Sequence, residues 1–576
     1  MADTNMQPEQ SRESRSPLDT WNDPGLLATY LRKTKEPSGD RGVDPQSIRA
    51  RAAYLRRRIE DLERVRSQLE PARLGLVDTE LASARFKHKI ALWLMFPINQ
   101  LPPEILALIF HFVLNSSDGP HQAVWHRLVI TWVCRYWRDV AINDKLFWNI
   151  IWFRDRPPYT RSLAWVDRAG SALLEIRIDE MKRRAGETED PPKLTREQVN
   201  AVMDALLAKV STLRTLVMVV HTRPAALAVL EKFRAAGQPV SLERFEIHRS
   251  GPPNESPSVV TPATHPDEGR EHIVLFNGDA PRLKWLVING VGIDWRQSPI
   301  ANLTTIDLRR LSSPCCPPLD RWLDILQACP SLYRLALDAA GPKLQPDSDA
   351  ISRPPVDLLN LRDLFIGDAS VLYAKYIFTY MTTPALTCLT LLNLWNDDFG
   401  PLFDLLVGRF PNLRILALYH IQVARIDIHL NSLARFFDSI PRLQYLKLSR
   451  AAQLIGESLL ENPREHRRGR IHYTDTKREV LCPELRWMTV HFQEVALVKT
   501  VLRRRRELGA PFQKVYYLPA NPQYTKEAME ELATFLEDGV HRIPDNFAQT
   551  NEEKVVHREM LKAGKLDIVP LYDDVW

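Results

Sequence analysis

The sequence predicts an α/β protein with three parts: an N-terminal helix, a small all-α bundle, and a long irregular solenoid of alternating strands and helices. Three observations support this prediction. Apolar residues between 55 and 69 follow a helical period. A proline-led apolar stretch, LPPEILALIFHFVL, begins at Leu101. The pattern Pro-x-Leu-x-x-[Leu/Met]-x-[Leu/Ile/Val] recurs along the chain from Pro281 onward, and such recurrence is typical of stacked structural units.

Composition excludes several classes of protein. The chain has 576 residues, 45% of them hydrophobic and 26% charged, which is typical of globular proteins with several domains. A net charge of +5 over this length does not indicate nucleic acid as a partner. The six cysteines show no paired spacing, so we expect neither a disulfide framework nor a metal site, and no cofactor. No signal sequence or membrane span is visible, which predicts a cytosolic or nuclear location.

The N-terminal region divides into a tail and a helix. Residues 1–45 are rich in Ser, Pro, Asp and Arg, and we expect them to be disordered. Within 46–96, Leu55, Ile59, Leu62 and Leu69 fall on one helical stripe, which predicts a helix that ends near Pro71. Two alternatives stay open for this helix: it packs on its own chain, or it forms a short coiled coil.

Residues 97–152 predict a compact helical unit. Pro102 and Pro103 suit the first turn of a helix, and Glu104 complements the positive end of its dipole. A second helical run follows between Trp125 and Ile142. About fifty residues then carry more apolar surface than so small a unit can bury, so part of this surface is expected to face a partner.

These residues resemble an F-box. The resemblance rests on LPxEIL from Leu101, on VCRxWRDVA from Val133, and on Leu146-x-Trp148, in the expected order. It implies a helical bundle that binds a Skp-family adaptor and, through it, a cullin-RING ubiquitin ligase. The motif residues that we expect to face the adaptor are Leu101, Pro102, Ile105, Leu106, Ile109, Phe110, Val133, Cys134, Trp137, Leu146 and Trp148. The alternative is a helical hairpin packed wholly inside this chain.

The repeat begins after this unit, in a region that we place at residues 160–520. The segment that opens it, WVDRAGSALLEIRI from Trp165, resembles the one that follows the F-box in many fungal F-box proteins. Six copies of the repeat contain the proline, and looser copies begin at Leu173, Leu213, Leu242, Leu303 and Leu361. From Leu303 to Leu443 the first leucines of consecutive copies lie 25 to 30 residues apart. Helical runs such as Leu319 to Ala328 lie between them, which predicts one strand and one helix per unit.

The repeat resembles leucine-rich repeats but lacks the asparagine that follows the strand in that family. The matching positions hold Val291, Ala340, Ala369, Leu394, Ile421, Ala451 and Gln493. Two insertions, Gly251 to Arg270 and Glu461 to Arg478, interrupt the period. We therefore expect an irregular array with these insertions as mobile loops, followed by a C-terminal tail or cap at residues 521–576.

Alternation along the predicted strands selects a candidate binding surface for a target protein. When the repeat leucines point inward, the residues between them project from the strand face. Aromatic side chains are favoured anchors at interfaces. The proposed core of the target-binding face is Trp285, Phe365, Tyr419 and Tyr445. The competing explanation is that the tail after about Pro511 folds back and covers such residues.

The sequence shows no motif for catalysis by this chain. Phosphate-binding glycine loops, GxSxG and HExxH are absent, and the pairs Asp397-Asp398, Asp573-Asp574 and Cys315-Cys316 suit solvated or structural roles. We predict a non-catalytic substrate-recognition subunit that binds an adaptor through residues 97–152 and an unknown target through the repeat. A scaffold that acts without ubiquitin transfer is the alternative, and an enzyme hidden in the repeat is a third hypothesis.

Overall fold

The computed structural model describes residues 45–67, 74–95, 98, 101–117, 120–153, 155–180, 193–251, 273–344, 353–394, 397–461, 480–518, 525–536, 539–543 and 549–563. The chain forms two compact units. The first holds residues up to Ile151 and Ala164–Ala172, and the second holds Trp152–Leu163 and Leu173–Asp573. The predicted disordered tail and the two predicted mobile insertions lie outside the described residues, except for Pro45, Gly251 and Glu461.

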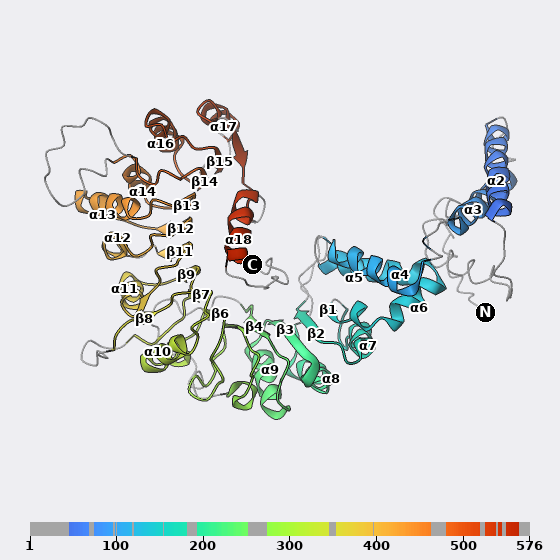
Figure 1. Ribbon diagram of the computed structural model, residues 1–576, viewed down its shortest axis with the longest axis horizontal. Coiled ribbons are helices and arrows are strands. Elements are labelled where there is room, and N and C mark those ends of the chain that lie inside the picture. Colours follow the sequence, from blue (N-terminus) through green and yellow to red (C-terminus); the bar gives the residue numbers. More distant parts are fainter. Residues whose placement is uncertain are drawn as a thin grey trace, which may run out of the picture. The chain divides into compact units, whose positions relative to one another are not determined.

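The first two described helices, α2 (Pro45–Arg66) and α3 (Leu74–Leu94), pack against each other (Figure 1). Leu55 and Ala52 of α2 contact Ala91, and Leu62 contacts Leu81 and Ala84. The predicted stripe of α2 therefore faces a helix of the same chain, which is the first of the two alternatives. Among the described residues, neither helix nor any other is long and apolar enough to cross a membrane.

A small bundle of short helices follows. It consists of α4 (Pro103–Asn115), α5 (Pro120–Val133), α6 (Arg135–Asn143) and the 3₁₀ turn η4 (Lys145–Phe147), and α7 (Thr160–Ala169) comes after strand β1 (Ile150–Phe153). Pro102 is the N-cap of α4 and Pro103 its first residue, so the helix begins where the proline pair predicts. Glu104 lies in the first turn, where a negative charge is favoured.

The rest of the chain is built on one large sheet (Figure 1). Each inner strand of this sheet pairs with the strand of the sheet that comes before it in the sequence and with the one that comes after it. The pairings from β2 to β16 are parallel. A small second sheet pairs β8 (Val356–Asp357) with β10 (Met381–Thr382). The strands after β1 in the large sheet are β2 (Leu174–Asp179), β3 (Leu213–Val220), β4 (Arg244–Arg249), β5 (Trp285–Asn289), β6 (Thr305–Arg309), β7 (Arg334–Asp338), β9 (Asp363–Gly367), β11 (Cys388–Leu394), β12 (Ile415–Ile421), β13 (Tyr445–Ser449), β14 (Trp487–His491), β15 (Lys514–Leu518) and β16 (Val540–Arg542).

The repeat leucines determine where these strands begin. From β4 to β14, each strand starts two residues after the first leucine of a repeat copy, as β12 does after Leu413 and β13 after Leu443. These leucines are buried, because the chain turns inward there before it enters the sheet. At the entrances from β5 to β14, two successive amides donate to one carbonyl of the preceding unit, as Arg414 and Ile415 do to Thr387. The mixed α/β class that the sequence predicts is confirmed.

Helices connect most strands and cover one side of the sheet (Figure 1). The prediction of a helix in every unit is wrong between β5 and β6, where the described residues form turns rather than a helix. That connection holds Gly292, Pro299 and the Asp294 turn, a composition that favours loops. The connecting helices are α8 (Arg196–Leu207), α9 (Arg223–Ala235), α10 (Leu319–Gln327), α11 (Val371–Thr379), α12 (Gly400–Leu406), α13 (Asp427–Asp438), α14 (Gln453–Ser458), α16 (Val495–Glu507) and α17 (Thr525–Ala533).

A left-handed residue recurs at the exit of the strands. The sixth position, counted from the strand's first residue, has a positive φ of 44° to 74° in eight units. Its amide often donates to the next strand, as Ala339 does to Gly367 and Asp368 does to Leu392. The missing asparagine is thus replaced by a backbone turn, and the position after it points apolar side chains such as Leu394 and Ile421 inward. The eight residues are Gly290, Arg310, Ala339, Asp368, Asn393, His420, Arg450 and Phe492.

Candidate protein-interaction surfaces

The interior of the helical bundle is aromatic. Phe110 of α4 lies 5.0 Å from Trp137 and 6.0 Å from Phe147, between ring centroids. Trp148 is buried, and its indole N–H donates to the carbonyl of Ala141 at 2.7 Å. These contacts use the side chains that face inward from α4, α6 and η4, so they stabilise the bundle itself.

Two polar contacts hold parts of the bundle together, and a third caps one of its helices. The guanidinium of Arg127 is buried and donates to the carbonyl of Phe147 at 2.9 Å. The Tyr136 hydroxyl donates to the carbonyl of Leu101, also at 2.9 Å. Cys134 is the N-cap of α6, with its sulfur accepting from the Trp137 amide. The cysteine of the VCRxW motif therefore has a structural role at a helix start.

Two stripes of apolar side chains remain exposed on the bundle. Ile105, Leu108 and Phe112 lie on one face of α4 and are 44%, 55% and 75% exposed. They are spaced at i, i+3 and i+7, and we call them the α4 stripe. Trp125, Val129 and Trp132 form a similar stripe on α5. Contiguous exposed apolar surface on a unit of this size indicates a docking site for another protein.

The predicted adaptor residues fall into three groups in the structure. Pro102, Ile105 and Leu146 are exposed, while Leu106, Phe110 and Trp148 are buried in the bundle. The buried three support the surface from within, because their side chains are already packed. Leu108 and Phe112 were not among the predicted adaptor residues, although their helical spacing from Ile105 was a signal for them. The half-buried group is Leu101, Ile109, Val133, Cys134 and Trp137.

The side of the sheet opposite the connecting helices is the second candidate surface, and we call it the strand face. The first, third and fifth residues of each strand project onto it. Because the register from β4 to β15 is unshifted, equivalent residues line up in rows across the sheet. The row of first positions is Arg244, Trp285, Thr305, Arg334, Asp363, Cys388, Ile415, Tyr445, Trp487 and Lys514.

The rows from β2 to β9 hold many charges that pair within the face. Glu246 accepts from Arg244 at 2.6 Å and from His248 at 2.9 Å. Burial would raise the pKa of the Glu246 carboxyl, but its bonds to His248 and Arg244 outweigh this and lower the pKa to about 2. Asp307 and Arg309 form a similar pair at 2.7 Å. These side chains therefore pair with one another within the face.

Asp338 differs from its neighbours on the strand face. One of its carboxyl oxygens is buried without a hydrogen-bond partner among the described residues. Burial and the nearby charge of Asp368 raise the pKa of this carboxyl to about 6. A carboxylate that is desolvated and faces like charge is destabilising when ionised.

The four predicted target-binding residues are not gathered at one place. Trp285 and Phe365 are half-buried, and the Arg244 guanidinium lies 4.3 Å from the centre of the Trp285 ring. Tyr419 is half-buried on β12. Tyr445 is fully buried, so it is not exposed to another protein in this structure. We therefore remove Tyr445 from the exposed set, because the C-terminal part of the chain covers it.

The covering element is α18 (Asn551–Ala563), which lies across the strands from the connecting helices (Figure 1). Val556 packs with Cys388, Ile415 and Tyr445. Glu553 pairs with Lys447 at 2.5 Å, and both side chains are buried. The tail after Pro511 therefore does fold back, as the competing explanation held. The sequence analysis missed α18, although Thr550-Asn551-Glu552-Glu553 is a capping-box signature.

The acidic and cysteine pairs that were considered for catalysis lie in structural surroundings where the structure describes them. Burial raises the pKa of the Cys316 thiol to about 12, so this cysteine is a poor nucleophile. Asp397 accepts from the Val371 amide at 3.0 Å. Asp573-Asp574 lies outside the described residues. No group of three potential metal ligands occurs among the residues that the structure describes.

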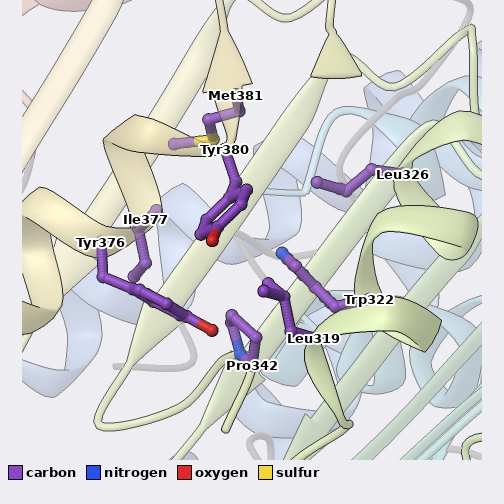
Figure 2. Close-up of a pocket in the computed structure, with 8 residues that line it drawn as sticks. All are labelled: Leu319, Trp322, Leu326, Pro342, Tyr376, Ile377, Tyr380 and Met381. Carbon is purple, nitrogen blue, oxygen red and sulfur yellow. The ribbon is translucent and has the colours of Figure 1, made fainter. Parts of the chain in front are cut away.

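A small hollow lies between α10 and α11 (Figure 2). Its wall is apolar and includes Trp322, Tyr376 and Met381. The free space in it is about that of one water molecule, whereas pockets for metabolites measure roughly 300 Å³ or more. The hollow is thus a packing defect between helices rather than a substrate site.

Comparison with known protein families identifies an F-box-like domain at residues 98–154. The match covers α4 to β1, the bundle that carries the α4 stripe. No curated protein matches the chain. The chain therefore carries an F-box-like domain, and domains of this kind generally bind Skp-type adaptors.

Proposed function

We propose that the chain is the substrate-recognition subunit of an SCF-type cullin-RING ubiquitin ligase. In this role the F-box-like domain binds a Skp-family adaptor, the adaptor binds a cullin, and the strand face holds a target protein. The chain contributes no reacting group, since ubiquitin transfer follows from holding the target close to the ligase. Such a complex acts in the cytosol or nucleus.

The α4 stripe is the observation that carries this proposal. Ile105, Leu108 and Phe112 are exposed on the domain at residues 98–154 that matches the F-box-like family. Burying them against an adaptor would contribute about 25 cal/mol for each Å² of apolar surface removed from water. Leu146, 59% exposed, extends the candidate adaptor surface.

We further propose that the second unit is a leucine-rich-repeat-like solenoid of the kind found in fungal F-box proteins. The support is the buried leucine before each strand from β4 to β14, the parallel order of the strands and the 25 to 30-residue spacing from Leu303 to Leu443. Repeat arrays present extended surfaces on which a target protein can bind.

The adaptor test compares substitutions on the bundle with one elsewhere. The variant I105A/L108A/F112A removes the α4 stripe without changing the helix start, whereas L101A/P102A alters the N-cap as well. Leu372→Ala is a matched control, because Leu372 is 69% exposed on α11 in the other unit. We expect the stripe variant to lose at least tenfold in adaptor affinity and the control to keep it. Unchanged adaptor binding by a folded stripe variant contradicts the proposal.

A second measurement separates ubiquitin ligation from a scaffold role. After adaptor capture by the wild-type chain, we expect a cullin in the same complex and the stripe variant to lose both proteins. An adaptor complex that repeatedly lacks a cullin would favour the scaffold alternative instead.

A further inference from the structure

The helix α18 begins with a reciprocal cap. The Thr550 hydroxyl accepts from the Glu553 amide at 3.3 Å, and the Glu553 carboxylate accepts from the Thr550 amide at 3.4 Å. This capping box fixes the start of the helix. Thr550 also donates to the Tyr445 hydroxyl at 3.0 Å, which joins the cap to the strand face.

Three acidic residues of α18 each meet a basic residue of the sheet region. Glu553 pairs with Lys447, as described above. Glu552 pairs with Lys514 at 2.8 Å and accepts from the Tyr516 hydroxyl at 2.7 Å. Glu559 pairs with Arg414 at 2.7 Å. With Val556 between them, these residues form the inner face of α18.

The strand face under α18 differs in charge from the rest of the face. From β2 to β9, the rows of the face combine arginines with six carboxylates, namely Glu175, Asp179, Glu246, Asp307, Asp338 and Asp363. The equivalent rows from β11 to β15 contain no acidic residue, and they contain Lys447 and Lys514. This part of the face is therefore suited to carboxylates from another element.

The described side chains of α18 bury less apolar surface than those of other helices of this fold. Val556 is the one buried apolar side chain among those described in α18, whereas α13 buries Leu433, Phe436 and Phe437 among others. The Arg414–Glu559 pair is half-exposed, so solvent screens it and it holds the helix only weakly. If α18 leaves, Lys447 regains water, so no unpaired charge stays buried. Covalent attachment, equivalent to roughly millimolar concentration, favours the docked helix.

We infer that the strand face from β11 to β15 is a docking surface for an acidic amphipathic helix, and that α18 occupies it until a target replaces it with a helix of the same chemistry. This inference rests on the proposed function, because it names the kind of target that the strand face selects. A competing helix needs carboxylates spaced like Glu552, Glu553 and Glu559 around an apolar residue. To displace α18, it must also make contacts with the strand face that α18 does not make.

The test supplies the α18 segment as a separate molecule. The probe is a fluorescein-labelled synthetic peptide of residues 549–563. The opened full-length chain is E553A/V556D/E559A, which disrupts the inner face of α18. The matched control is K554A/V555D/R558A, whose three residues are exposed on the outer face. We expect the peptide to bind the opened chain at least tenfold more tightly than the wild-type or control chain.

Charge substitutions then test the chemistry of the surface. Arg414→Gln with Lys514→Gln in the opened chain, or Gln at all three acidic positions of the peptide, should weaken binding at least tenfold. Equal binding to all three chains, or no binding to the opened chain, overturns the inference. An opened chain that fails to fold also overturns it, because α18 would then be part of the fold.

Hydrogen exchange on the unmodified chain gives an independent measurement. We expect amides 553–559 of α18 to exchange at least tenfold faster than those of α13, because a docked helix must leave without unfolding the sheet. Equally slow exchange of the two helices overturns the inference. Adaptor co-purification with the opened chain separates the two ideas. We expect the opened chain to retain the adaptor. Loss of adaptor binding by the wild-type chain would contradict the proposed function and not the inference about α18.

Discussion

The two candidate surfaces differ in what covers them. The α4 stripe of Ile105, Leu108 and Phe112 is exposed, whereas the apolar patch of Cys388, Ile415 and Tyr445 is covered by α18. Both surfaces bring apolar side chains into a row, one by helical spacing and the other by strand register. The difference shows that exposed aromatic residues cannot be read from strand alternation alone, because a distant segment of the same chain can bury them.

The largest expected effect separates the core of the bundle from the α4 stripe. Phe110 and Phe112 are two residues apart on α4, but Phe110 is buried and Phe112 is 75% exposed. Phe110→Ala should therefore lower the free energy of unfolding of the bundle by about 3 to 5 kcal/mol. Phe112→Ala should lower it by less than about 0.5 kcal/mol. Chemical unfolding followed by tryptophan fluorescence measures both, and equal losses would refute the separation.

The next effect concerns the part of the strand face that pairs its own charges. The pKa of Asp338 is raised from 3.8 to about 6, so its ionisation costs stability above pH 6, and this cost disappears as the pH falls towards 3.8. Asp338→Asn should stabilise the chain at pH 7 by at most about 3 kcal/mol. The gain should vanish near pH 4.

Thermal unfolding from pH 4 to pH 8 measures the effect of Asp338→Asn. Asp320→Asn is the control, because Asp320 is exposed in the first turn of α10. A gain that does not depend on pH would show that the charge of Asp338 is not its cause.

A smaller effect tests how the start of α18 is held over Tyr445. The Tyr445 hydroxyl is bonded to Thr489 at 2.7 Å and to Thr550 at 3.0 Å. Tyr445→Phe removes both bonds and should lower the free energy of unfolding by about 1 kcal/mol. Urea unfolding with Tyr54→Phe as the control checks this, since Tyr54 is 65% exposed on α2. A loss no greater than that of the control would mean that these bonds do not hold the cover.

The smallest expected effect concerns α2 and α3. The sequence alone predicts that the helix around Leu55 is dispensable for adaptor binding, which a deletion of residues 1–75 would test. Because α3 packs on α2, that deletion would leave an exposed apolar face, so the better truncation removes residues 1–96. Adaptor affinity should change less than twofold, and a folded truncation that loses the adaptor would extend the binding surface to this region.

The repeat leucines show how far local sequence predicts this fold. They locate the strands from β4 to β14 because each leucine must be buried where the chain enters the sheet. The F-box-like motif likewise locates the bundle. The sequence does not predict that the connection between β5 and β6 lacks a helix, because the period of the leucines fixes the length of a connection and not its conformation.

The candidate surfaces were less predictable, for two physical reasons. Helical spacing places Leu106 and Phe110 on one face of α4, but it cannot decide which face turns inward until the packing of Phe147 and Trp137 is known. Tyr445 is buried by contacts with residues more than a hundred positions away, including Thr550. No local pattern around β13 reports such a contact.

The left-handed turn at the strand exits has a consequence for how this protein can diverge. Eight successive units place residues as different as Gly290, Asp368 and Phe492 at the same backbone position, and none of the eight residues is buried. The turn is held by main-chain bonds to the next strand, so its geometry does not depend on one residue type. Substitutions at these positions can therefore change the chemistry of the strand exits in each unit separately and leave the leucine core unchanged.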